Sequence, residues 1–291
     1  MSQVKLGDKN IPFIYQGNEL LYPNPIKDGL VLWYDFKGMK NSDVSKGITK
    51  DLTGKTIENA QHFNFLYNSQ SGYNKGLKFD GIDDRVIPIL KHTDGTTSQL
   101  DMKKINNGQK FSVEMTLKMS DKLITQGSEI FMTSKTYGRF WLQFLKDNNI
   151  VSSDEYIISA STYYGPEGSR TVSAFSKTMG YKYGDEFHLV STVDKNGKIT
   201  LYVNGVKIGE QPLNDITITT PQDTGLIVFL GQGHSKAYYR RFEHELYSMK
   251  IYDKVLTDQE IQYNYNLEKE RWGIWYEICN CRFRIFPKVR I

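Results

Sequence analysis

Two glutamates near the end of the chain have the spacing that glycoside hydrolysis would use. Glu243 and Glu245 stand two positions apart, so on a β-strand both side chains would point to the same face. Retaining glycosidases hold two carboxyl groups about 5 Å apart, one as acid and base and the other as nucleophile. The pattern Glu-x-Asp-x-x-Glu, which would place further carboxylates on such a strand, does not occur. We therefore favour a solvated strand face over a catalytic pair, and we expect no enzyme activity.

Three aspartates in a short polar segment raise the question of a metal site. Asp80, Asp83 and Asp84 offer hard oxygen ligands, which are the ligands that Ca²⁺ prefers. The same segment is typical of a tight hairpin turn, in which carboxylates accept hydrogen bonds from nearby amides. The sequence favours the turn and keeps calcium as the candidate cofactor. The five histidines have no paired spacing that would indicate a transition-metal site.

Aromatic residues suggest a third kind of site, a carbohydrate-binding surface. They make up 13% of the chain, and flat rings can stack on sugar faces while neighbouring polar groups bond to ring substituents. We expect two tyrosine pairs to lie in loops. Adjacent residues on a strand face opposite sides, so even on a strand the two members of a pair could not both lie in the core. The predicted carbohydrate-binding residues are Tyr163, Tyr164, Tyr238, Tyr239, Arg240 and Trp141.

The composition argues against several other functions. Cys279 and Cys281 alone cannot form a disulfide framework or a four-cysteine zinc site. The net charge of +4 is mild, so we expect no nucleic-acid partner. Neither a Gly-x-Ser-x-Gly motif nor a phosphate-binding glycine loop occurs. No run approaches the roughly 18 apolar residues of a membrane span, and residues 1–6 lack the apolar core of a secretory signal.

Short strands must position most of these residues. Across 29–252, apolar runs with strand-like alternation are separated by turn residues. The clearest hairpin joins 187–193 to 198–203 through a turn that contains Asn196-Gly197, and Asn204-Gly205 supplies the next turn. Asn-Gly favours such turns because both residues readily adopt positive φ angles. Many short strands without alternating helices predict an antiparallel β-sandwich.

Different elements flank this sandwich on both sides. Residues 1–27 form a predicted N-terminal β-arm for assembly or docking, because two strand-turn-strand units precede a proline-rich linker. The sandwich itself is assigned to 28–255. Thr257 and Glu260 have the spacing of a capping box, so a helix begins the C-terminal part, 256–291. Its hydrophobic and basic end is either a docking segment or a membrane-surface segment, and we favour docking.

Six motifs occur in a consistent order along the chain, at 29–36, 51–54, 77–84, 111–115, 187–205 and 247–261. Together they resemble the concanavalin A-like, laminin-G-like jelly-roll domains of bacterial and phage surface proteins. The resemblance implies an all-β, antiparallel jelly-roll β-sandwich. Residues 242–246 depart from the family pattern, in which a glycine usually occupies the middle of that loop.

The short N-terminal units at 5–11 and 15–21 resemble segments of tail and baseplate proteins of phages that infect Gram-positive bacteria, with staphylococci as one candidate host. This resemblance implies a non-enzymatic virion protein whose sandwich binds a host cell-surface glycan. It also implies other virion proteins and further copies of the chain as partners. Such a protein is made in the host cytoplasm without a signal peptide and ends up in the extracellular particle. The alternatives are a carbohydrate-active enzyme or its accessory binding module, and a purely structural virion decoration.

Overall fold

The structure is a computed structural model in which short β-strands alternate with turns and one helix follows them. It describes residues 5–6, 9–10, 14–16, 19–22, 24–54, 59–91, 96–99, 105, 109–119, 128–133, 140–145, 157–164, 170–175, 181–182, 184–194, 196–213, 228–230 and 243–274. The elements are β1 (Lys5–Leu6), β2 (Lys9–Asn10), β3 (Ile14–Gln16), β4 (Glu19–Tyr22), β5 (Leu30–Asp35), β6 (Ile48–Thr49), β7 (Ala60–Phe63), β8 (Gly72–Tyr73), β9 (Leu77–Asp80), β10 (Arg85–Lys91), β11 (Thr97–Gln99), β12 (Lys110–Met119), β13 (Ser128–Thr133), β14 (Phe140–Leu145), β15 (Ile157–Tyr164), β16 (Arg170–Phe175), β17 (Glu186–Asp194), β18 (Lys198–Val203), β19 (Val206–Pro212), β20 (Val228–Leu230), β21 (Glu243–Tyr252) and α1 (Asp258–Trp272).

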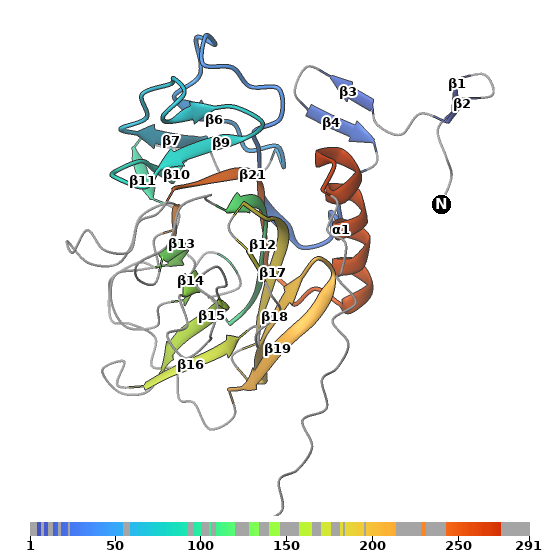
Figure 1. Ribbon diagram of the computed structural model, residues 1–291. Helices are drawn as coiled ribbons and strands as arrows, with labels where there is room; N and C mark the ends of the chain where they lie inside the picture. The colour runs from blue at the N-terminus through green and yellow to red at the C-terminus, as the bar shows by residue number, and fades with distance from the viewer. Residues whose placement is uncertain are drawn as a thin grey trace, which may run out of the picture.

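Two antiparallel sheets form a sandwich (Figure 1). One sheet has the order β16-β15-β14-β13-β20-β10-β7-β6, with β11 beside β10. The other has the order β19-β18-β17-β12-β21-β9-β8, with β5 beside β21. This arrangement confirms the predicted antiparallel jelly-roll sandwich. Asn196-Gly197 and Asn204-Gly205 do lie between β17 and β18 and between β18 and β19. The predicted positive φ angles occur only at Asn204 and Gly205, with 51° and 78°.

The core lies between the two sheets, and strand alternation decides which side chains enter it. Val113, Met115 and Leu117 on β12 belong to the same buried cluster as Leu142 and Phe144 on β14. The intervening β12 residues therefore face the opposite side of their sheet. That outer face is where polar and charged side chains gather.

Helix α1 covers part of this outer face (Figure 1). Its predicted capping box is confirmed, since Thr257 accepts a hydrogen bond from the Glu260 amide and Glu260 reaches back to the Thr257 amide. Gly273 ends the helix in the left-handed conformation, with φ of 63°. Ile261 and Leu267 of the helix pack with Trp33 and other apolar side chains of the sheet.

Buried charges lie beneath the helix. The Lys250 ammonium lies 2.7 Å from a Glu114 carboxylate oxygen and 2.8 Å from a Glu268 oxygen. Burial alone would raise the pKa of the Glu114 carboxyl, but the Lys250 and His188 side chains hold this pKa at about 2. Arg271 also pairs with Glu268, at 3.0 Å. A buried charge is tolerated only when it is paired and hydrogen-bonded, so this network requires the helix to dock in one register.

The N-terminal hairpins are attached to the sandwich through the same helix. Figure 1 shows β1–β2 and β3–β4 standing away from the two sheets. The chain then reaches α1, where the Ile26 amide donates to Asn264 at 3.0 Å and the Tyr263 hydroxyl donates to the Asn24 carbonyl at 2.9 Å. Pro25 between them is buried. Residues 24–26 of the predicted arm therefore contact the body of the protein.

The predicted docking segment at 275–291 lies outside the described residues. Within the ranges given above, no helix is both long enough and apolar enough to cross a membrane.

Candidate functional site

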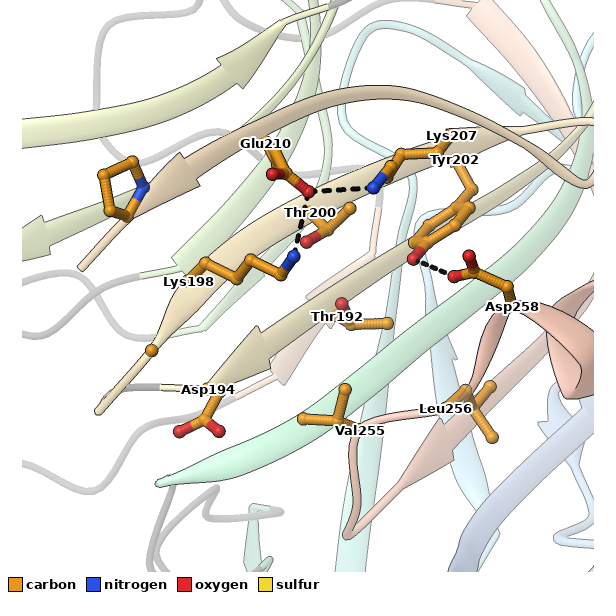
Figure 2. A pocket seen from close by; sticks show the side chains of 12 residues that line it. Thr192, Asp194, Lys198, Thr200, Tyr202, Lys207, Glu210, Val255, Leu256 and Asp258 are labelled. Carbon is orange, nitrogen blue, oxygen red and sulfur yellow. Dashed lines mark hydrogen bonds and ion pairs between the residues drawn. The ribbon is translucent and has the colours of Figure 1, made fainter. Parts of the chain in front are cut away.

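A groove of about 640 Å³ opens on the outer face of β17, β18 and β19, beside the start of α1 (Figure 2). Strands β17 and β18 form its floor, β19 forms one side, and the segment leading into α1 forms the other. Twelve residues line it: Thr192, Asp194, Gly197, Lys198, Thr200, Tyr202, Lys207, Glu210, Pro212, Val255, Leu256 and Asp258.

Two threonines form the centre of the floor. Thr192 and Thr200 are directly opposite each other on β17 and β18, so their side chains share one face of the sheet. They are 3% and 1% exposed, respectively. Neither hydroxyl forms a hydrogen bond with any other residue that the structure describes. Neither oxygen is among the buried polar atoms that lack a partner, so both hydroxyls open to the groove and a polar ligand can reach them.

A β-bulge aims two charged side chains of β19 at the groove. The pairing shifts between Leu201 and Tyr202, so that Tyr202 is opposite Lys207 while Thr200 is opposite Glu210. In an unbroken strand, residues three apart would face opposite sides. The bulge instead brings Lys207 and Glu210 together, with their charged atoms 3.0 Å apart.

Glu210 binds a second ammonium as well. The Lys198 nitrogen lies 3.0 Å from the same carboxylate oxygen that contacts Lys207 (Figure 2). Hydrogen bonds from the two lysines lower the pKa of the Glu210 carboxyl, and the bond to Glu210 raises the pKa of the Lys207 ammonium. Glu210 and Lys207 are therefore both charged near neutral pH.

The opposite side of the groove is held in place by bonds to the sheet. The Ser112 hydroxyl of β12 donates to the Lys254 carbonyl at 2.8 Å and accepts from the Leu256 amide at 3.0 Å. The Tyr202 hydroxyl donates to Asp258, the first residue of α1, at 2.7 Å. Burial and the neighbouring Asp258 carboxylate raise the pKa of the Tyr202 hydroxyl, which stays protonated.

The groove can therefore bind a polar ligand rich in hydroxyl groups. It offers two threonine hydroxyls, three carboxylates and a partly exposed apolar side chain, Val255. Each carboxylate already has a partner: Lys110 lies 3.0 Å from Asp194, and Glu210 and Asp258 make the bonds described above. This arrangement suits recognition by hydrogen bonds and van der Waals contact.

A protein-family model matches residues 93–262, a range that contains the whole groove. The model describes the concanavalin A-like lectin/glucanases superfamily. The chain belongs to this superfamily. No curated protein sequence matches it.

Several solved structures have a similar fold. The binding domain of botulinum neurotoxin DC, in complex with rat synaptotagmin II, is 13% identical, with a TM-score of 0.56, over 86% of this chain and 53% of that one. The same domain in complex with SialylT is 13% identical, with a TM-score of 0.54 and the same coverage. The receptor binding domain of botulinum neurotoxin D is 16% identical, with a TM-score of 0.54, over 84% of this chain and 54% of that one. The chain thus spans about half the length of these domains, and the likeness concerns the fold.

The predicted carbohydrate-binding residues are not gathered at this groove. Tyr163 and Tyr164 are the last two residues of β15, paired with Thr171 and Arg170, so the prediction that they lie in a loop is corrected. Trp141 on β14 is only 5% exposed, which is the position of a core ring and not of an exposed stacking surface. The remaining three, Tyr238, Tyr239 and Arg240, lie outside the described residues.

The aspartate cluster forms a hairpin turn between β9 and β10. Asp80, Asp83 and Asp84 hold their oxygen atoms within 4.8 Å of one another, a spacing that a metal ion could use. The turn already uses two of the carboxylates: Asp80 accepts from the Ile82 amide at 2.7 Å, and Asp84 accepts from the Asp80 amide at 2.8 Å. Burial raises the pKa of the Asp84 carboxyl to about 7. The sequence favoured a hairpin turn over a calcium site, and these hydrogen bonds are those of such a turn.

The two glutamates spaced for catalysis serve the fold. Glu245 accepts a hydrogen bond from the Gly76 amide at 2.6 Å, and Glu243 pairs with Lys78 at 3.2 Å. Both partners lie on or next to β9, which runs beside β21. Glu245 is buried by this contact.

Sequence reasoning missed the groove, although one signal for it was present. The predicted hairpin between 187–193 and 198–203 places Thr192 opposite Thr200 once its turn is assigned. Nothing in the local sequence reveals the bulge that turns Lys207 and Glu210 to the same face, or the bond that joins Tyr202 to the start of α1.

Proposed function

We propose that this chain is a non-enzymatic glycan-binding protein and that the groove over β17–β19 holds the sugar. The observation that carries the proposal is the pair of hydroxyls on Thr192 and Thr200, which open to the groove without a hydrogen bond to any other described residue. A sugar presents hydroxyl groups that can both donate and accept, so it can form hydrogen bonds with both threonine hydroxyls at once. Val255 beside them offers an apolar contact for the carbon face of a ring.

The engagement of the carboxylates supports binding over hydrolysis. A glycosidase needs one carboxyl group to protonate the leaving oxygen and a second to act as nucleophile or base. In the groove, two lysines lower the pKa of the Glu210 carboxyl, and Asp194 pairs with Lys110. Outside it, Glu245 is tied to the backbone of Gly76.

The biological setting that we propose is a phage tail or baseplate, with a host cell-wall glycan of a Gram-positive bacterium as the ligand. The resemblance of 5–11 and 15–21 to tail-protein segments supports this setting, as do the hairpins that stand away from the sandwich. Other virion proteins and further copies of this chain would then be the partners of the hairpins. Tyr163, Tyr164, Tyr238, Tyr239 and Arg240 stay proposed as a second contact surface. Several weak sites on one particle would give firm adhesion through effective concentration.

The test is retention of the purified chain on Gram-positive cell walls and on an oligosaccharide array, with Thr192→Val and Thr200→Val as the variants. One lost hydrogen bond is worth about 1 kcal/mol, so each variant should bind roughly fivefold more weakly. Thr116→Val is the matched control, because Thr116 also lies on the outer face but its hydroxyl bonds to Glu268 beneath α1. Undiminished binding by the double variant would overturn the assignment of the groove. Steady release of reducing sugar would show an enzyme instead.

A further inference from the structure

We propose that the groove selects uncharged glycans and discriminates against glycans that carry carboxylate, sulfate or phosphate groups. This inference rests on the proposed glycan-binding function and names the ligand class of the same site. It comes from the distribution of charge around the two central threonines.

The groove has no surplus of positive charge. Three carboxylates line it, those of Asp194, Glu210 and Asp258, against the two ammonium groups of Lys198 and Lys207. Lys110 pairs with Asp194 from beside the groove, so these charges balance and an anionic substituent would meet three carboxylates without any net positive charge. Like charges brought together in a binding site oppose association, and this is a common source of specificity.

The two ammonium groups are also already engaged. Both lie 3.0 Å from one oxygen of Glu210, which bridges them on the β19 side of the groove (Figure 2). An incoming carboxylate or phosphate would have to displace Glu210 from one lysine while approaching its negative charge. Recognition of an anion normally uses charged donors that point at the ligand, and here the bulge in β19 has given those donors an internal partner.

The centre of the floor suits an uncharged sugar. The hydroxyls of Thr192 and Thr200 lie between the Glu210 cluster on one side and the Tyr202–Asp258 pair on the other. Each hydroxyl can donate one hydrogen bond and accept others, which matches a sugar hydroxyl in either orientation. Asp258 and Asp194 keep carboxylate oxygens at the rim that can accept hydrogen bonds from further sugar hydroxyls.

The experiment uses an array of matched pairs, in which each neutral oligosaccharide stands beside its sialylated, sulfated or phosphorylated form, such as lactose beside 3′-sialyllactose. We expect the neutral member of each bound pair to be retained at least tenfold more strongly by the full chain. Binding should also change little between 50 and 500 mM NaCl, because no ion pair with the ligand forms. Stronger retention of the anionic member, lost in Thr192→Val, would overturn the inference while leaving glycan binding in place. Failure to bind any member would overturn the proposed function together with it.

A charge variant tests the mechanism directly. Glu210→Gln removes the bridging carboxylate and releases both lysines, so the ratio of anionic to neutral binding should rise by about tenfold. Glu270→Gln is the matched control, since Glu270 is exposed on α1 away from the groove and its loss changes the net charge equally. Equal shifts in the two variants would mean that net charge and not the Glu210 bridge decides the selectivity, and the inference would fail.

Discussion

Thr192 and Thr200 lie directly opposite each other on neighbouring strands, and their hydroxyls face the same groove without a hydrogen bond to another described residue. Neither oxygen is among the buried polar atoms that lack a partner, so both can exchange hydrogen bonds with solvent for hydrogen bonds with a ligand in the groove. This relationship also makes the binding site separable from the fold. Removing either hydroxyl breaks no hydrogen bond between the residues that the structure describes.

The threonine variants should therefore fold as well as the natural chain. Replacing Thr192 or Thr200 by Val deletes a hydroxyl that has no described partner, so we expect the free energy of unfolding to stay the same or rise by up to about 1 kcal/mol. Urea denaturation followed by circular dichroism measures this. Thr116→Val, by comparison, should lose about 1 kcal/mol because it breaks the bond to Glu268. A clear loss of stability in the two groove variants would show that their hydroxyls bond within the fold.

Lys250 should be far more important for stability than an exposed lysine. Lys250→Met would leave Glu114 and Glu268 buried against each other without their shared cation. Breaking a buried ion pair from one side typically costs about 3–5 kcal/mol. Thermal and chemical unfolding should show this loss, whereas Lys198→Met at the surface should leave the unfolding curve nearly unchanged. Similar curves for the two variants would contradict a docking role for the buried network.

Gly76 should tolerate no side chain. A Cβ at this position would lie 2.4 Å from the Leu246 carbonyl oxygen and 2.6 Å from a ring atom of Tyr247. Because one of these atoms belongs to the backbone of β21, Gly76→Ala must push β9 and β21 apart, and we expect a loss of more than about 2 kcal/mol. Gly54→Ala is the control: nothing lies within 4 Å of its Cβ, and its cost is the positive φ of 65°, about 1 kcal/mol. A Gly76→Ala protein as stable as Gly54→Ala would contradict this packing.

Stability should fall as the solution is acidified from about pH 6.5 to pH 4, and His62 should account for part of the change. Burial lowers the pKa of the His62 imidazole to about 4, from an ordinary value of 6.5. In that range the unfolded chain binds a proton that the folded chain does not, so protonation favours unfolding, with a total effect on the order of 3 kcal/mol. Stability curves at several pH values for the natural chain and for His62→Gln measure it. An identical pH slope in both proteins would show that His62 does not contribute.

Residues before Asn24 should not be needed for the stability of the sandwich, whereas residues 24–27 should be. A chain that begins at Asn24 keeps the bonds of Ile26 to Asn264 and of Tyr263 to Asn24, and we expect it to unfold at the same temperature as the full chain. A chain that begins at Asp28 loses both bonds and the burial of Pro25. Its melting temperature should fall by several degrees, since about 1 kcal/mol corresponds to roughly 2–4 °C for a domain of this size. Equal melting temperatures for the two shortened chains would place the boundary at residue 28 after all.

The sequence by itself determined the kind of fold and several local elements. Strand alternation and the two Asn-Gly turns predicted the β17–β18–β19 meander, and Thr257 with Glu260 predicted where α1 begins. These features are readable because each depends on residues within a few positions of one another, where backbone preferences and short-range hydrogen bonds decide the outcome. The resemblance to the superfamily followed from motifs that are each a short local pattern, together with their order along the chain.

The tertiary structure decided which polar residues face one another, and local patterns do not contain that information. Lys250 meets Glu114 and Glu268 only because β12, β21 and α1 stack, although the three residues are far apart in the chain. Tyr202 meets Asp258 for the same reason. Packing also decides that the aspartates at 80–84 bond within their own turn and that Trp141 is buried. Whether a polar or aromatic side chain is available to a ligand depends on the partner that packing brings to it, and only the folded sheets and helix supply those partners.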